Sequence, residues 1–306
     1  MGAIEVLNPG ALTTVQDLGR FGYAHLGISP AGAADSLSLR IANRLVGNHE
    51  DAPAIEMTLV GAKLQFHQLC TIALAGADIA SSALPMLEAV LVEAGFTLDC
   101  GPLRERARTY LAVAGGIAVP KILGSASTHL AAKFGGFEGR ALKRGDVLAV
   151  GNAERKPSTV DSARLRELTK MRDPLRVTLG PQYRSFDEHN LQRFRESAYV
   201  VTEQSNRLGL RLSGPAITSS SPKELLTEGV SLGAIQIPPN GQPIILSVDQ
   251  QTTGGYPKLA NVIAADMHCI GQLRPRDTLR FEMISVDEAI SALRDQGSRL
   301  AEVLGE

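Results

Sequence analysis

The sequence is poor in aromatic residues and in cysteine. Its 306 residues include no tryptophan, eight phenylalanines, five tyrosines and three cysteines. It also lacks an excess of either charge, because 31 basic side chains stand against 32 acidic ones. A net charge of −1 argues against a nucleic acid or an anionic membrane held by bulk electrostatics. No apolar run approaches the roughly 20 residues that a membrane-spanning helix needs.

The cysteines and histidines indicate neither disulfides nor a metal. Cys70, Cys100 and Cys269 are odd in number and widely spaced, and the N-terminus lacks the pattern of a signal peptide. We therefore expect reduced thiols in a cytoplasmic protein. Cys70 lies in an apolar segment, which predicts a buried, inert thiol. The six histidines do not have the spacing of a zinc site, so we expect no metal on this chain.

Glycine and proline are abundant, at 30 and 16 residues, while 44% of the chain is apolar. This composition predicts a folded, turn-rich protein, and the length suggests two domains. Short strand-like runs recur at roughly 8–12-residue spacing, which is typical of barrels and sandwiches. The predicted fold class is mainly β with a few helices.

The organisation along the chain follows from changes in composition. We predict a β-rich N-terminal domain over 1–151, a connecting segment with a helix over 152–173, and a C-terminal domain with a terminal helix over 174–306. Apolar periodicity and capping signals predict helices at Ala33–Val46, Ser162–Met171, Asp187–Arg195, Pro257–Ile270 and Val286–Leu304.

The densest polar stretch runs from Asp249 to Pro257, after an apolar strand and before the helix predicted at Pro257. Asp249 could orient a substrate amide or act as a general base, and Thr252 and Tyr256 could donate to a carbonyl oxygen. The N-terminus of the following helix would favour an anion. Alternatively, the two glycines of the stretch form a tight turn and Thr253 caps the helix.

Three other polar clusters contain glycine. In the first, Asp17 and Arg20 hold each other, or Arg20 binds a carboxylate or phosphate. In the second, residues 124–128 offer hydroxyls to a phosphate, although no P-loop motif occurs and barrel turns explain much of the segment. In the third, Arg207 contacts a ligand or pairs with an acid.

These clusters resemble one family, allophanate hydrolase subunit 2, also called biotin-dependent carboxyltransferase-like. The resemblance covers nearly the whole chain. It is carried by these segments: Thr13–Arg20, Arg40–Asn48, Tyr110–Ile117, Gly124–Thr128, Gly145–Asp146, Gly233–Gln236 and Asp249–Pro257.

The resemblance implies cyclophilin-like β-barrel domains. Within the family, Glu203–Gly209 and Asn240–Ile244 resemble members that act on 5-oxo-L-proline. The resemblance therefore implies ATP-dependent opening of this lactam to L-glutamate, with ATP and its Mg²⁺ counter-ion bound in a hetero-oligomer. The implied partners are the B subunit of 5-oxoprolinase, in direct contact, and the A subunit of the same enzyme. We expect this chain to be inactive alone.

The resemblance also implies roles for individual residues. The catalytic candidates are Asp249, Thr252 and Tyr256. The substrate-binding candidates are Asp17, Arg20, Arg207, Gln236, Gln250, Gly254 and Gly255. The phosphate or nucleotide candidates are Ser125, Ser127 and Thr128.

Two alternatives remain open within the family. One is a carboxyltransferase acting on urea or a related amide with carboxybiotin from another chain. Thr169–Arg172 is the nearest approach to a biotin-bearing Ala-Met-Lys-Met segment and does not match it, so we expect no covalent biotin here. The other is a regulatory protein whose binding partner resembles a kinase inhibitor.

Overall fold

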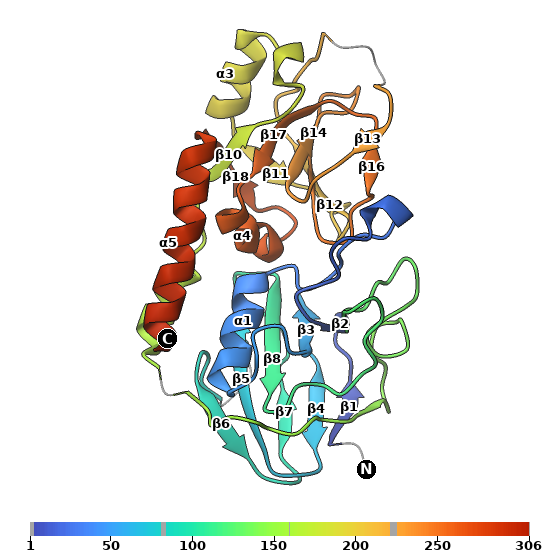
Figure 1. Ribbon diagram of the computed structural model, residues 1–306, viewed down its shortest axis with the longest axis vertical. Coiled ribbons are helices and arrows are strands. Elements are labelled where there is room, and N and C mark those ends of the chain that lie inside the picture. The colour runs from blue at the N-terminus through green and yellow to red at the C-terminus, as the bar shows by residue number, and fades with distance from the viewer. Residues whose placement is uncertain (1–2, 81–83, 159, 221–224, 306) are drawn as a thin grey trace. The chain divides into compact units, whose positions relative to one another are not determined.

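The computed structural model describes residues 3–80, 84–158, 160–220 and 225–305 (Figure 1). Residues 1–2 and 306, at the ends of the two predicted domains, lie outside the described residues. The chain divides into two compact units. Unit 1 comprises Met1–Arg20, Ala31–Lys170 and Arg299–Glu306, and unit 2 comprises Phe21–Pro30 and Met171–Ser298.

Unit 1 is built on two antiparallel sheets. Over the described residues, their strand orders are β2-β3-β8-β5-β6 and β7-β4-β1-β9. The strands are β1 (Ile4–Asn8), β2 (Leu12–Gln16), β3 (Ala54–Thr58), β4 (Lys63–Phe66), β5 (Cys70–Gly76), β6 (Ala89–Val92), β7 (Thr97–Asp99), β8 (Arg108–Val113) and β9 (Val147–Leu148).

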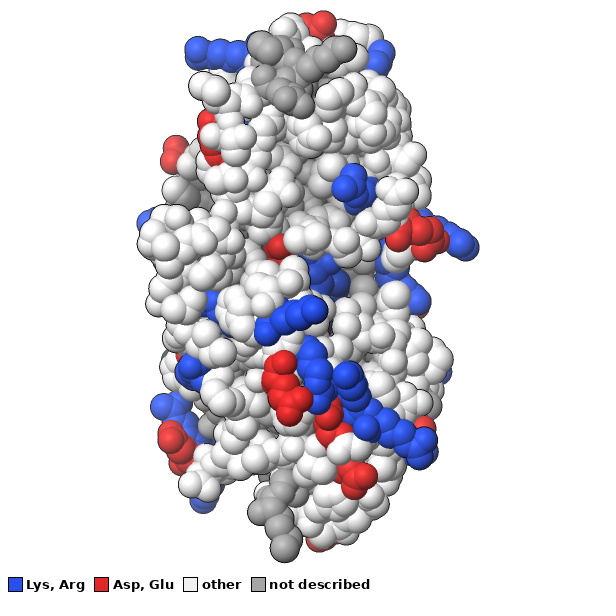
Figure 2. All heavy atoms as spheres, turned by 90° about the vertical axis from the view of Figure 1, so that its right-hand side faces the viewer, with Lys and Arg blue, Asp and Glu red and all other residues white. Residues whose placement is uncertain are grey.

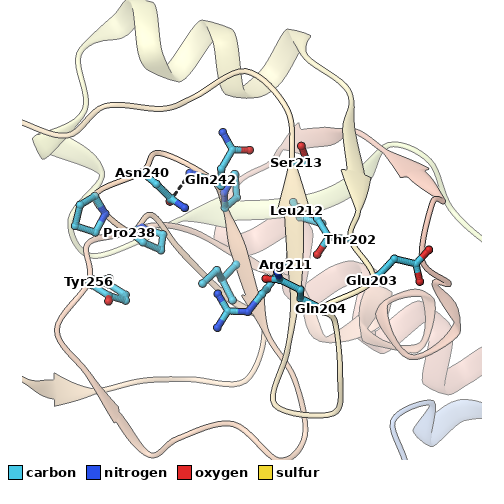
Figure 3. Close-up of a pocket in the computed structure, with 13 residues that line it drawn as sticks. Thr202, Glu203, Gln204, Arg211, Leu212, Ser213, Pro238, Asn240, Gln242 and Tyr256 are labelled. Carbon is cyan, nitrogen blue, oxygen red and sulfur yellow. Dashed lines mark hydrogen bonds between the residues drawn. The ribbon is translucent and has the colours of Figure 1, made fainter.

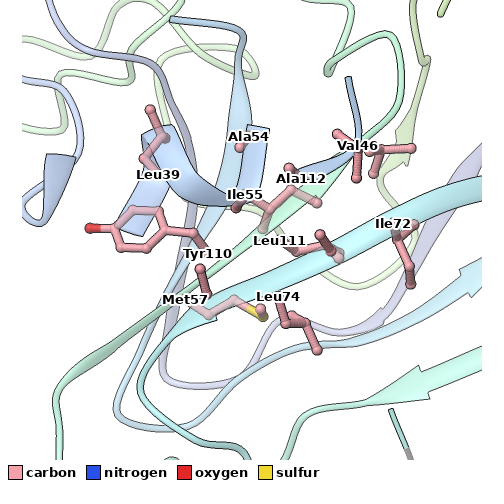
Figure 4. Close-up of a cluster of buried hydrophobic side chains, with 14 of the residues drawn as sticks. Leu39, Val46, Ala54, Ile55, Met57, Ile72, Leu74, Tyr110, Leu111 and Ala112 are labelled. Atoms are coloured by element: carbon pink, nitrogen blue, oxygen red, sulfur yellow. The ribbon is translucent and has the colours of Figure 1, made fainter. Parts of the chain in front are cut away.

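Helix α1 (Ser36–Leu45) packs on β5 and β8 of the larger sheet. It begins where the Asp35 carboxylate accepts a hydrogen bond from the Ser38 amide at 2.9 Å, which satisfies one exposed N–H of the first turn. Its apolar face, including Ile41, is fully buried. Figure 4 shows this core, in which Leu39 of the helix lies near Ile55 of β3 and side chains of β8. The buried face of α1 therefore belongs to the same core as the larger sheet.

Unit 2 contains a sheet of order β18-β11-β12-β15-β14-β17-β10-β19 over the described residues, nearly closed into a barrel. Only the β10–β19 pair in this sheet is parallel among the pairings described. Its strands are β10 (Leu175–Leu179), β11 (Tyr199–Val201), β12 (Gly209–Ser213), β14 (Ala234–Gln236), β15 (Ile244–Leu246), β17 (Lys258–Val262), β18 (Thr278–Leu279) and β19 (Phe281–Met283).

Shorter elements complete the molecule. β13 (Glu228–Gly229) pairs with β16 (Thr253–Gly254) in a separate antiparallel ribbon. The remaining helices are η1 (Ala24–Leu26), α2 (Ser162–Leu168), η2 (Tyr183–Ser185), α3 (Glu188–Glu196), η3 (Ala264–Asp266), α4 (Met267–Gln272) and α5 (Val286–Leu304). Stacked Phe194 and Phe281, with ring centroids 4.4 Å apart, join α3 to the core of unit 2.

The predicted class, mainly β with a few helices, is confirmed. The helices predicted at Ala33–Val46, Ser162–Met171, Asp187–Arg195 and Val286–Leu304 are present as α1, α2, α3 and α5. Cys70 is buried as predicted, and all three cysteines are free.

The helix predicted at Pro257–Ile270 is wrong over most of its length. Lys258–Val262 forms β17, and α4 begins only at Met267. β17 lies between β14 and β10, so its backbone groups are paired on both edges and four of its five side chains are buried. Because both faces of this strand are largely buried, its sequence Lys-Leu-Ala-Asn-Val lacks the polar–apolar alternation by which a strand is recognised.

Charge is mixed on the surface. Figure 2 shows one face of the molecule, on which acidic and basic side chains are interspersed among uncharged residues. Among the described residues, no helix has both the length and the apolar character needed to span a bilayer.

Candidate ligand-binding site

In unit 1 the predicted residues form one buried polar cluster. Asp17 follows β2, and its carboxylate accepts hydrogen bonds from the Ser125 hydroxyl at 2.6 Å, the Ala126 amide at 2.6 Å and the Ser127 hydroxyl. It also accepts from the Gly19 amide at 2.8 Å. The three donors from residues 125–127 hold a segment more than 100 residues away against the end of β2. The carboxylate is thereby committed to the fold.

Arg20 binds the same segment. Its Nη2 donates to the Ser127 carbonyl, and its guanidinium carbon lies 4.7 Å from the centre of the Phe134 ring. The side chain is 2% exposed, so it is packed within unit 1. Asp17 and Arg20 thus share a structural partner, the segment around Ser127.

The hydroxyls of the three nucleotide candidates point into the protein. Ser125 and Ser127 donate to Asp17, and Thr128 donates to the Val15 carbonyl at 2.9 Å. All three residues are at most 1% exposed. A phosphate here would meet a carboxylate and hydroxyls that are already used as donors, so these three residues do not fit a nucleotide.

In unit 2, Asp249 and Arg207 form a buried ion pair. Arg207 Nε lies 2.8 Å from Asp249 Oδ2, and Nη2 lies 3.0 Å from Oδ1. The two side chains are 5% and 6% exposed. The open alternative that Arg207 pairs with an acid is therefore confirmed, and the acid is Asp249.

The Gln250 side chain is hydrogen-bonded within unit 2. Its amide nitrogen donates to the Ser231 carbonyl and its amide oxygen accepts from the Leu232 amide, each at 3.0 Å. It fixes the loop that leads into β14. Its side chain is 5% exposed.

Thr253 and Gly254 form β16, and the chain passes through Gly255 and Tyr256 directly into β17. The expectation that a helix N-terminus at Pro257 would favour an anion is therefore wrong, because no helix begins there. Gly254 packs closely against its neighbours. A Cβ on Gly254 would lie 2.5 Å from Nε2 of Gln236 and 3.2 Å from Cγ1 of Val230, so these side chains would have to shift.

Gln236 and Lys258 lie opposite each other on two neighbouring strands. They are partners in the antiparallel pairing of β14 with β17, whose register shifts between Ile235 and Gln236. Gln236 is 1% and Lys258 3% exposed. Among the described residues, the Gln236 Nε2 has no hydrogen-bond partner.

Lys258 lines a cavity of about 320 Å³, which we call the Lys258 cavity. The polar side chains on its wall are Ser231, Thr252, Lys258 and Asn261. Lys258 Nζ lies 2.5 Å from Glu228 Oε1 and 3.5 Å from the Tyr256 carbonyl. The hydrogen bond from Lys258 and a second one from Gln182 lower the pKa of Glu228.

A larger cavity of about 720 Å³ lies elsewhere in unit 2. Tyr256 and Arg211 are on its wall (Figure 3). Asn240, which accepts a hydrogen bond from the Gln242 amide at 3.1 Å, shapes one side. Of the three catalytic candidates, Tyr256 lines this cavity, Thr252 lines the Lys258 cavity, and Asp249 lines neither.

Sequence reasoning missed Lys258 and Glu228. Lys258 falls inside the expected helix, where a lysine is an ordinary surface residue. Glu228 is distant in sequence from Gly254 and meets it only through the pairing of β13 with β16. Within the described part of the chain, no group of three or more His, Cys, Asp or Glu side chains is arranged to hold a metal ion.

Residues 26–283 match the family described as "Carboxyltransferase domain, subdomain A and B". The chain belongs to this family, which confirms the resemblance read from its motifs.

The similar proteins divide into two kinds. The chain is 40% identical to the C subunit of 5-oxoprolinase from Escherichia coli, over 96% of this chain and 95% of that protein. It is 35% identical to urea amidolyase of Saccharomyces cerevisiae, over 96% of this chain but 17% of that protein. The crystal structure of the K. lactis urea amidolyase superposes with a TM-score of 0.93 at 34% identity, covering 98% of this chain and 20% of that one.

Proposed function

We propose that this chain is the C subunit of an ATP-dependent 5-oxoprolinase, which converts 5-oxo-L-proline, ATP and water to L-glutamate, ADP and phosphate. It would act in contact with the B subunit and together with the A subunit. The supporting observation is the match to a 5-oxoprolinase C subunit along 95% of that protein. The urea amidolyase that it resembles extends far beyond the matched region.

The proposed reaction requires activation of the substrate before water attacks it. A lactam is stabilised by resonance and is a poor electrophile, so water attacks it slowly. Transfer of a phosphoryl group to the carbonyl oxygen creates a leaving group, and positioning and electrostatics supply most of the catalysis. The buried donors of unit 2 suit the binding of substrate oxygens on this chain.

The test is co-expression with candidate A and B subunits, followed by an assay of 5-oxoproline-dependent ATP hydrolysis. We expect turnover by the three-chain complex and loss of turnover when this chain is omitted. A purified three-chain complex that shows no 5-oxoproline-dependent hydrolysis would refute the proposal.

The structural similarity to urea amidolyase favours a second candidate, carboxyl transfer to urea or a related amide. The carboxybiotin would come from another chain. Addition of avidin, which sequesters biotin, distinguishes the two candidates. Amide-dependent ATP hydrolysis that avidin abolishes would favour carboxyl transfer. 5-Oxoproline-dependent ATP hydrolysis that avidin does not affect would favour the 5-oxoprolinase.

A further inference from the structure

Two hydrogen-bond donors are buried side by side in unit 2, at Lys258 and Gln236. They are partners in the β14–β17 pairing and are at most 3% exposed. Gln236 presents an amide nitrogen without a partner among the described residues. This nitrogen and the Val230 side chain of the cavity wall both lie beside Gly254, although Gln236 itself does not line the cavity. A buried donor left unsatisfied is costly, so such a group indicates a missing acceptor.

Among the described residues, the acceptors bonded to Lys258 are fewer than its N–H groups. The Lys258 ammonium has three N–H groups, and its partners are the Glu228 carboxylate at 2.5 Å and the more distant Tyr256 carbonyl at 3.5 Å. Thr252 adds a hydroxyl to the same cavity wall. Ser231 is already used, since its hydroxyl donates to Asn261 Oδ1 at 2.6 Å. A surplus of donors around one ammonium suits an anionic ligand rich in oxygen.

We propose that the Lys258 cavity binds the carboxylate of a small cyclic amide, with the Lys258 ammonium as counter-ion and the Gln236 amide as a further donor. The inference rests on the proposed function and assigns 5-oxoproline recognition to this chain. Lys258 is thus a specificity residue that distinguishes 5-oxoproline from the same lactam without a carboxylate.

Glu228 tunes this site. Its side chain is 46% exposed, whereas Lys258 is 3% exposed, so the carboxylate that holds the ammonium comes from the solvent side. An incoming substrate carboxylate competes with it for the same N–H groups. Removal of the Glu228 charge should therefore strengthen substrate binding, which is opposite to the effect of removing the Lys258 charge.

The experiment measures binding of 5-oxoproline and of 2-pyrrolidinone to the assembled complex by titration calorimetry. Lys258→Met should weaken 5-oxoproline binding about 10- to 100-fold, the range for loss of a hydrogen bond to a charged group. It should leave 2-pyrrolidinone binding within about twofold, since that ligand has no carboxylate to lose a partner. Glu228→Gln should tighten 5-oxoproline binding by about two- to fivefold, as expected for removal of a half-exposed ion pair.

Two further variants distinguish a loss of ligand contacts from a loss of folding. Gln236→Glu keeps the size of the side chain but adds a competing carboxylate, and it should weaken 5-oxoproline binding selectively. Lys63→Met removes a lysine from an exposed ion pair with Asp99 in unit 1 and should leave both affinities unchanged. Melting curves of each variant complex report its folding.

The outcomes separate the inference from the function on which it rests. Unchanged 5-oxoproline affinity in both folded Lys258→Met and folded Gln236→Glu complexes would overturn the inference while the wild-type activity upheld the function. Equal losses for both ligands would also overturn it, because they would indicate a purely structural role. A wild-type complex that neither binds nor hydrolyses 5-oxoproline would remove the proposed function itself.

Discussion

Asp249 and Arg207 show how burial limits the role of a side chain. The sequence places them in two polar loops and suggests a catalytic role for Asp249, which stays a prediction. In the folded chain they form a two-point ion pair that is almost closed to solvent. Removing one partner of such a pair costs more than the pair contributes, because a buried charge loses its counter-charge. Substitution of Asp249 is therefore expected to lower the stability of unit 2, whatever its effect on catalysis.

We expect Asp249→Ala to lower the free energy of unfolding by about 3–5 kcal/mol. The double variant Asp249→Ala/Arg207→Met should lose less than the sum of the single variants, because it leaves no unpaired charge. Urea denaturation of the purified chain measures both. As a control, Glu203→Ala breaks an ion pair with Arg276 whose two side chains are 65% and 87% exposed, and should change stability little. Strict additivity would contradict a buried, coupled pair.

Asp146 supplies a pH-dependent contribution to the stability of unit 1. The hydrogen bond from Arg140 lowers its pKa below 3.8, aided by the Lys143 amide. A lowered folded-state pKa means that the stabilisation is present above about 3.8 and is lost as pH falls through the folded-state pKa. Asp146→Asn should therefore reduce the melting temperature most near neutral pH, with a gap that narrows below pH 3.8. A gap that stays constant with pH would exclude this linkage.

At the scale of elements, turns and strand order position the polar clusters. Gly115 follows β8 with a φ of +93°, where a Cβ would lie 2.1 Å from the Gly151 carbonyl oxygen. This approach joins the end of β8 to the segment after β9. In β17, by contrast, local composition does not determine the structure. Its residues are compatible with a helix, but pairing with the neighbouring strands β14 and β10 makes the segment a strand. As a result, Lys258 lies on the wall of a cavity and not on the surface of the expected helix.

Two glycines with similar backbone angles separate conformational strain from steric clash. Gly145 has a φ of +87°, and a Cβ added there would have no atom within 4 Å, so Gly145→Ala should cost about 1–2 kcal/mol from backbone strain alone. Gly115→Ala adds a clash with backbone and should cost roughly 3 kcal/mol or more. Chemical denaturation of the two variants gives the comparison. Equal costs would show that the Gly151 contact yields easily.

At the scale of the whole molecule, each predicted site cluster belongs to one unit. Asp17, Arg20 and the 125–128 segment lie in unit 1, whereas the Asp249–Lys258 segment lies in unit 2. The units are not simple halves of the chain. Residues 21–30 belong to unit 2 and residues 299–306 to unit 1. The predicted domains, 1–151 and 174–306 with a connecting segment at 152–173, rest on composition, which carries no information on which distant segments pack together.

We expect the purified chain alone to show no 5-oxoproline-dependent ATP hydrolysis. The sequence has no P-loop motif, and the hydroxyls of Ser125, Ser127 and Thr128 already donate within unit 1. A coupled assay for ADP on the single chain, with the three-chain complex as positive control, checks this. Turnover by the single chain at a rate near that of the complex would contradict the proposed division of labour.

The sequence by itself determined the family, the mainly β class and most of the helices. Motifs, apolar periodicity and capping residues such as Asp35 act over a few residues, so they can be read locally. Only the tertiary structure decided which partners the polar side chains take. Asp17 meets Ser125 across 108 residues, and Lys258 meets Gln236 through strand pairing. Burial and strand order are properties of the assembled chain, and they decide whether a polar residue supports the fold or faces a cavity.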